Sequence, residues 1–124
     1  MNTVQAQLVG SWTTELDNDG TPALGLVAFS ADGGVTSTQL NTKHIGLGTW
    51  RATGATTFEY AFHILASDDE GKHVGEARIH VEGEIVDDGT WVGTGGATFY
   101  NPEGKSLRGH GGSKVVAKKF GIGK

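Results

Sequence analysis

The chain has 124 residues, of which 36% are hydrophobic and 19% charged, and its formal net charge is -4 at pH 7. This length supports a single domain spanning residues 1–124, and the acidic balance with dispersed basic residues argues against nucleic-acid binding. Cysteine is absent, which excludes disulfides, thiolate metal sites and cysteine nucleophiles. The 21 glycines, against two prolines, predict many turns and strands that bend.

The first ten residues, MNTVQAQLVG, precede the β-forming part of the chain. Val4 and Leu8 are spaced to mark at most one helical or irregular turn. The segment lacks the basic start and continuous apolar run of a signal peptide. No apolar stretch approaches the roughly 20 residues of a membrane-spanning helix. We therefore expect a cytoplasmic protein with no membrane span.

From Ser11 onward, short alternating runs are separated by turn sequences such as DNDGTP, ADGG, SDDEGK and NPEGK. Asp-Gly and Glu-Gly recur in these turns because glycine reaches positive φ without a steric clash. The predicted strands are, in chain order, Ser11–Leu16, Ala23–Ser30, Val35–Leu40, Leu47–Thr53, Thr56–Leu65, His73–Val86, Thr90–Tyr100 and Ser106–Lys118. No segment carries a sustained 3.6-residue apolar period, so the predicted fold class is all-β.

Eight sequential antiparallel strands can avoid exposed sheet edges by closing into an up-and-down barrel or by forming a sandwich of two sheets. An internal echo favours the barrel: GTWRATGATTFEY at residues 48–60 is followed by GTWVGTGGATFY at residues 89–100, with a shorter GSW at residues 10–12. A closed meander uses the same kind of hairpin at each step, so a repeated hairpin sequence is what this fold predicts. We therefore predict an eight-stranded antiparallel up-and-down β-barrel, whose interior either fills with side chains or holds one small ligand.

Alternation assigns the inner faces of two predicted strands. Phe58, Tyr60, Phe62 and Ile64 form one apolar face. In the next strand the inner residues are Ala77, Ile79, Val81, Gly83 and Ile85, opposite Glu76, Arg78, His80, Glu82 and Glu84. Glycines also fall in the middle of the last two strands, at positions 93, 95, 109, 111 and 112. Either the barrel coils sharply there or a ligand lies beside the strands, and both alternatives stay open.

The sequence Gly10-Ser11-Trp12 resembles the Gly-x-Trp signature on the first strand of the lipocalins and the wider calycin superfamily. The likeness extends to strand number and hairpin spacing, and is closest to compact bacterial lipocalin-like barrels. A Thr-Asp-Tyr segment, a C-terminal helix and a cysteine pair are missing. Avidins are also similar, but their later tryptophan pattern is absent. The resemblance implies a barrel whose lumen accepts a small, mostly apolar ligand.

The aromatic residues supply most of the candidate ligand site, because aromatic walls are common in small-molecule cavities. Trp12 is interpreted as a plug across the barrel end. Trp50 and Trp91 either belong to a plug or the barrel wall, or contact a ligand. Tyr60 either orients a carbonyl-bearing ligand or bonds to a neighbouring strand. The predicted ligand-binding residues are Trp50, Phe58, Tyr60, Phe62, Trp91, Phe99 and Gln39.

Two histidines are candidates for general acid–base chemistry beside Tyr60. His44 lies in a loop at one barrel end, and His110 lies in RGHGG, where a glycine bulge could turn it into the lumen. No His-x-His or HExxH spacing occurs, so no metal site is predicted, and no cofactor is expected. His80 and Glu82 are interpreted as part of a solvated, salt-bridged surface.

The leading functional hypothesis is that the lumen binds a small apolar or aromatic molecule. The alternative is a cyclase or isomerase acting on a polyketide-like natural-product intermediate, which would work by shape with one or two polar groups for positioning. An outward apolar residue such as Leu65 or Val92 could form part of a homodimer interface.

Overall fold

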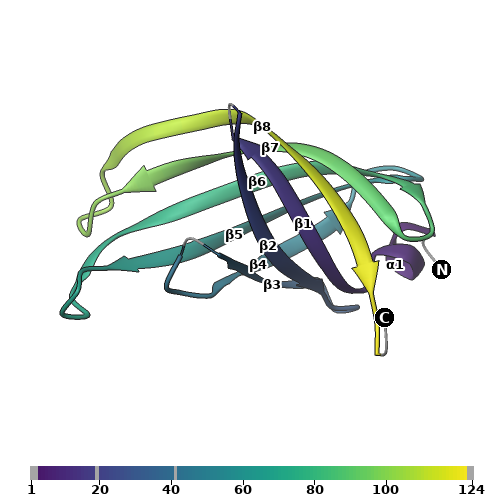
Figure 1. The fold of residues 1–124 in the computed structure, drawn as a ribbon, viewed down its shortest axis with the longest axis horizontal. Helices are drawn as coiled ribbons and strands as arrows, with labels where there is room; N and C mark the ends of the chain where they lie inside the picture. The colour runs from purple at the N-terminus through teal and green to yellow at the C-terminus, as the bar shows by residue number, and fades with distance from the viewer. Residues whose placement is uncertain (1–2, 19, 41, 123–124) are drawn as a thin grey trace.

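The computed structural model describes residues 3–18, 20–40 and 42–122, and within them one helix is followed by eight strands. Each strand pairs antiparallel with the next and β8 pairs with β1, so the sheet closes into the predicted up-and-down barrel (Figure 1). The elements are α1 (Thr3–Leu8), β1 (Gly10–Asn18), β2 (Thr21–Phe29), β3 (Gly34–Gln39), β4 (Gly46–Ala52), β5 (Thr57–Ser67), β6 (His73–Asp87), β7 (Thr90–Tyr100) and β8 (Ser106–Phe120). Among the described residues, no helix has the length and apolar composition needed to cross a membrane.

The barrel wall is taller on one side than on the other. Strands β1 to β4 have 6 to 9 residues, whereas β5 to β8 have 11 to 15. The β5–β6 and β7–β8 hairpins therefore extend past the shorter strands, at the left of Figure 1. Strand β8 pairs with β1 only from Lys114 onward, so residues 106–113 pair with β7 alone. We call this end of the barrel the open end.

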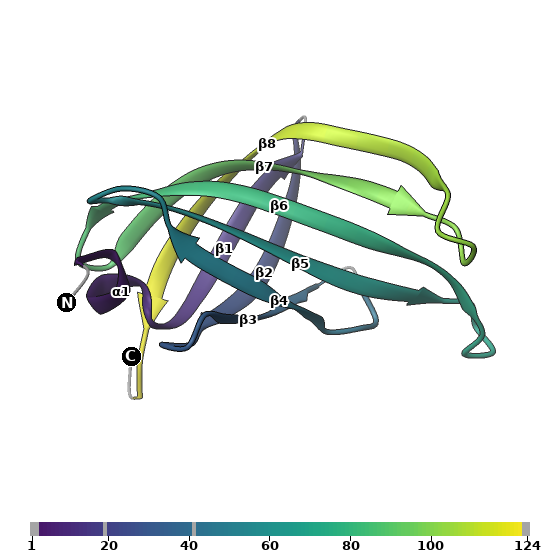
Figure 2. The same cartoon turned by 180° about the vertical axis from the view of Figure 1, so that it is seen from behind.

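At the opposite end, which we call the helix end, α1 lies beside the barrel opening (Figure 2). Two tryptophans plug this end together with the helix. Val4 and Leu8 of the helix are fully buried, as are Trp12 and Trp91. The Trp12 indole Nε1 donates a hydrogen bond to the Leu8 carbonyl at 2.9 Å. The indole rings of Trp12 and Trp91 pack edge-on with centroids 6.2 Å apart. The interpretation of Trp12 as a plug is thus confirmed.

A cluster of aromatic rings fills the barrel interior next to this plug. Phe29 lies at its centre, with its ring edge-on to four others at centroid distances of 5.1 to 6.3 Å; these are Trp50, Phe58, Tyr60 and Trp91. Phe58, Tyr60 and Phe62 stack along β5, with adjacent ring planes tilted by 12° to 13°. Offset and edge-on contacts of this kind suit the ring quadrupoles. The predicted inner face of β5 is confirmed.

Close packing accounts for several glycines. A Cβ atom at Gly46 would lie 2.5 Å from the Phe62 ring, and one at Gly93 would lie 2.6 Å from the Glu82 carbonyl oxygen. At Gly48 it would overlap the backbone of Ala61. Rings and neighbouring strands therefore occupy the space that side chains would need, as expected for a tightly coiled barrel.

Candidate functional site

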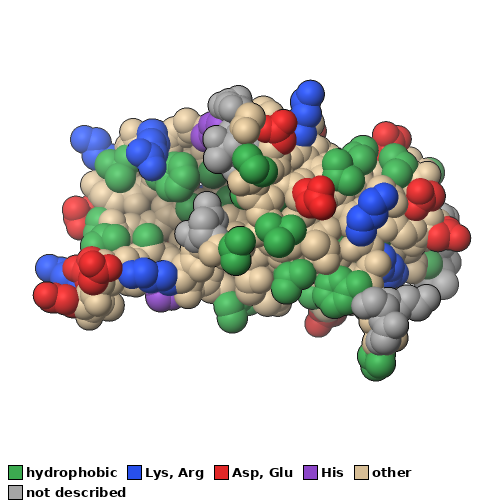
Figure 3. Space-filling model, viewed as in Figure 1, with side chains coloured by type: hydrophobic (Ala, Val, Ile, Leu, Met, Phe, Trp, Pro, Cys, Tyr) green, Lys and Arg blue, Asp and Glu red, His purple; other side chains and the backbone are tan. Residues whose placement is uncertain are grey.

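The inner wall changes character between the two ends of the barrel. On β6 the inward-facing Val81 and Ile85 are buried, whereas Ile79, nearer the open end, is half-buried. Strand β7 follows the same gradient, because Trp91 is fully buried and Ala97 is half-buried. Ile79 and Ala97 are paired across the two strands, so their side chains lie side by side. Figure 3 shows the surface hollowed toward the open end, with apolar side chains around the hollow.

A β-bulge brings a histidine and a serine together on this wall. His110 pairs with Ala97 and Ser113 pairs with Gly95, so both face inward although three positions separate them. A regular strand would place them on opposite faces. The register shift lies between these pairs, and Gly112 has a φ of 77°, a conformation that side-chain-bearing residues rarely adopt. The His110 Nε2 and Ser113 Oγ atoms are 3.1 Å apart, within hydrogen-bond distance.

Two further predicted residues belong to the open end. Gln39 pairs with Gly25 and is half-buried near the end of β3. Phe99 is also half-buried, and the Arg108 guanidinium carbon lies 4.8 Å from its ring centroid. This cation–π contact places a positive charge beside the apolar wall.

Tyr60 lies deeper in the interior and carries an uncommitted hydroxyl group. Its side chain is only 5% exposed, and burial raises the pKa of the phenol above its ordinary value. Among the described residues, the Tyr60 hydroxyl has no hydrogen-bond partner, so the expected alternative of a bond to a neighbouring strand is not found. A buried tyrosine hydroxyl usually has a partner. It therefore remains available to a polar group that enters the interior.

The remaining predicted ligand-binding residues lie within or beside the aromatic cluster. Phe58, Phe62 and Trp91 are buried against other rings. Trp50 is half-buried, and its Nε1 donates a hydrogen bond to the Ser30 carbonyl at 2.8 Å, in the turn between β2 and β3. These contacts assign all four residues a packing role in the described structure, and their contact with a ligand stays a prediction.

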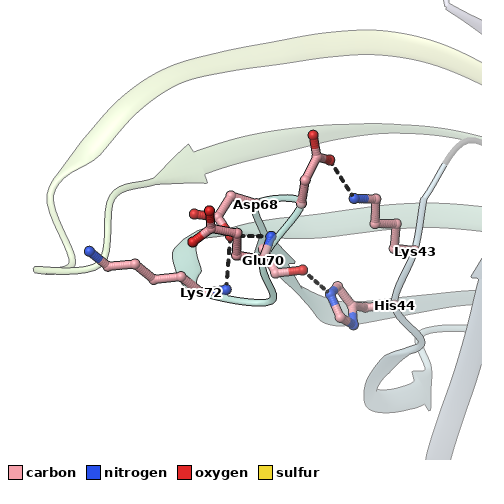
Figure 4. A network of polar contacts seen from close by, with 7 residues as sticks. Lys43, His44, Asp68, Glu70 and Lys72 are labelled. Carbon is pink, nitrogen blue, oxygen red and sulfur yellow. Dashed lines mark hydrogen bonds and ion pairs between the residues drawn. The ribbon is translucent and has the colours of Figure 1, made fainter.

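His44 lies on the rim, apart from the inner wall. It is exposed in the β3–β4 connection, and its Nε2 lies 2.7 Å from the Ser67 hydroxyl. The adjacent Lys43 forms an ion pair of 3.2 Å with Asp69 (Figure 4). Together these contacts hold the β3–β4 connection against the β5–β6 turn. The structure thus brings His110 and Tyr60 to the interior but leaves His44 outside it.

Sequence reasoning missed some residues of this site. Alternation put Ile79 on the inner face, but it did not show that burial of the inner wall decreases at Ile79, toward the open end. Ser113 was missed although it alternates regularly with the buried Val115, and the bulge is what brings His110 to the same face. Phe29 was missed as the centre of the ring cluster. Strand β2 carries leucines on its outer face as well, so its sequence shows no clear polar–apolar alternation.

These features define an eight-stranded antiparallel up-and-down barrel, compatible with a lipocalin-like fold, that is plugged at one end and has a half-buried, mainly apolar wall at the other. Comparison of the chain with protein-family models and with curated proteins found no match.

Proposed function

We propose that this protein is a binding barrel of the calycin type that holds a small apolar or aromatic molecule at its open end. One observation carries the proposal: the apolar inner face of β6 and β7 is buried at the helix end and only half-buried at the open end. A ligand that covered this wall would remove apolar surface from water, which is the main driving force for such binding.

Polar groups on and near the wall favour a ligand with one hydrogen-bonding function. Gln39 offers an amide, and the pair formed by His110 and Ser113 offers an imidazole and a hydroxyl. The buried Tyr60 hydroxyl can donate to an acceptor such as a carbonyl oxygen, because its raised pKa keeps the phenol protonated. The proposed ligand therefore has a mostly apolar body and at least one hydrogen-bond acceptor.

Blocking the wall should weaken binding strongly while leaving the fold intact. In the variant Ala97→Phe, the larger ring would project between Ile79 and His110. The neutral fluorescent probe N-phenyl-1-naphthylamine should bind the unmodified protein with enhanced emission and raise its melting temperature, since ligand binding stabilises the native state. We expect Ala97→Phe to weaken this binding at least tenfold.

The matched control is Thr36→Phe, which adds the same ring to an exposed outward position of β3. Circular dichroism should show the same strand content in both variants. Probe binding that survives in Ala97→Phe, or that is absent from the unmodified protein, would contradict an open-end site.

A second candidate function is the cyclisation or isomerisation of a polyketide-like intermediate at the same place. The observation that favours it is the presence of the Tyr60 hydroxyl and the His110 imidazole on the inner face of one barrel. Such a site would act by holding one folded conformation of the substrate and by moving a proton between substrate atoms.

Turnover of a polyketide-like substrate should then fall by about 10² to 10⁴-fold in His110→Ala, the range typical for loss of a general acid or base. Tyr60→Phe should lower turnover while leaving the melting temperature nearly unchanged, because the phenol has no partner to lose among the described residues. His44→Ala, on the rim, serves as the control. Equal rates in all three variants would remove the catalytic roles proposed for His110 and Tyr60, and absence of any turnover in the unmodified protein would leave simple binding as the function.

A further inference from the structure

The outer surface of the tall wall brings together three metal-binding side chains from two strands. Glu59 on β5 pairs directly with Glu82 on β6, and His80 lies two residues before Glu82, on the same face. One donor atom from each of these residues lies within 4.8 Å of the others. We call this set the outer cluster.

The hydrogen bonds of Glu59 leave one of its oxygen atoms directed into the outer cluster. Arg51 binds the Oε1 atom through its Nε and a terminal nitrogen, each at 2.6 Å. The other oxygen, Oε2, lies 3.5 Å from Nε2 of His80. Arg51 thus acts as a positioning residue that holds the carboxylate in place from outside the cluster, as partners of metal ligands commonly do.

The outer cluster also has an unbalanced charge. Like charges placed directly opposite each other on neighbouring strands destabilise a sheet. Arg51 compensates Glu59, but within the described part of the chain Glu82 forms no ion pair or hydrogen bond through its side chain. A cation bound between the two carboxylates would relieve this repulsion.

Open space surrounds the outer cluster on three sides. These are shallow hollows open to solvent: one of about 300 Å³ is bordered by Glu59 and His80, one of about 460 Å³ by His80 and Glu82, and one of about 740 Å³ by Glu59 and Glu82. The three donors therefore stand where the three hollows meet. An ion bound there would keep coordination positions open to water or to a further ligand.

We propose that Glu59, His80 and Glu82 form a divalent-metal site on the outside of the barrel that takes Zn²⁺. Imidazole together with carboxylates suits this ion, whereas Ca²⁺ and Mg²⁺ take oxygen ligands in larger numbers. Donors held at about 2.0 to 2.2 Å around a tetrahedral ion are about 3.4 Å apart. The 3.5 Å between Glu59 Oε2 and His80 Nε2 already matches this value. Only the exposed Glu82 side chain has to rotate toward these two atoms.

Calorimetric titration of the full chain with zinc chloride tests the proposal. The unmodified protein should bind one Zn²⁺ per chain, and its melting temperature should rise with Zn²⁺ but not with Mg²⁺. The variants His80→Gln and Glu82→Gln should each weaken Zn²⁺ binding at least tenfold, because each replaces one metal ligand by a neutral side chain of similar size.

Two control variants separate the outer cluster from other surface donors. His63→Gln removes a histidine outside the cluster whose Nδ1 lies 3.3 Å from the Glu76 carboxylate. Glu84→Gln removes a neighbouring acidic residue on the same face of β6. Both should bind Zn²⁺ within about twofold of the unmodified protein. Absence of Zn²⁺ binding, unchanged binding in His80→Gln, or an equal loss in His63→Gln would overturn the proposal.

Discussion

Replacement of Trp91 by alanine is expected to lower the free energy of unfolding by about 3 to 5 kcal/mol, the cost typical of truncating a large buried aromatic residue. Trp91 is fully buried, and its ring packs against Trp12, Phe29, Phe58 and Tyr60 at centroid distances of 5.2 to 6.3 Å. Its removal leaves a hole bordered by rigid rings that cannot collapse into it. Urea denaturation followed by circular dichroism measures the change.

Trp91→Phe provides the matched comparison for this prediction. The smaller ring retains much of the packing, and the substitution also removes the indole Nε1, which is buried without a hydrogen-bond partner in the described structure. An unpaired buried donor carries a desolvation cost of about 1 to 3 kcal/mol, so its removal offsets part of the lost packing. We expect Trp91→Phe to cost less than half as much as Trp91→Ala. Equal losses would show that the cluster does not depend on ring packing at this position.

Gly48→Ala is expected to destabilise the barrel by about 3 kcal/mol, at the upper end of what overpacking usually costs. The new Cβ atom would overlap the Ala61 carbonyl group and the Phe62 Cα atom on the adjacent strand. Backbone atoms of a paired strand cannot rotate away, so β4 and β5 would have to separate. A fall in the urea midpoint with an unchanged slope would show this loss of stability.

Gly111→Ala is the control, because no atom lies within 4 Å of a Cβ built at that position. It should leave the urea midpoint almost unchanged or raise it slightly, since alanine reduces the conformational freedom of the unfolded chain. Similar destabilisation by both substitutions would refute the explanation of Gly48 as a close-approach glycine.

The predictions that succeeded rest on local patterns. Asp-Gly and Glu-Gly turns separate the strands, and alternation along residues 58–64 put Phe58, Tyr60 and Phe62 on the inner face. Both signals depend only on neighbouring residues, because a strand repeats every two residues and glycine relieves strain within a single turn. The barrel followed from these signals and from the need to leave no free sheet edge.

The candidate site was predicted less completely, because its parts depend on distant contacts. The inward position of His110 could be suggested from RGHGG, but its contact with Ser113 needs the bulge at Gly112 and the register of β8 on β7. The outer cluster likewise depends on register, since Glu59 and Glu82 are 23 positions apart in the sequence and become neighbours only through strand pairing.

The sequence by itself determined the strands, their turns and the inner face of β5, because side-chain alternation and glycine conformations are properties of short segments. Only the tertiary structure decided that one end of the barrel is plugged and the other lined by half-buried apolar side chains. The depth of a residue depends on the unequal heights of the wall strands and on the rings that pack against it. Those contacts join residues far apart in the chain, and no local pattern encodes them.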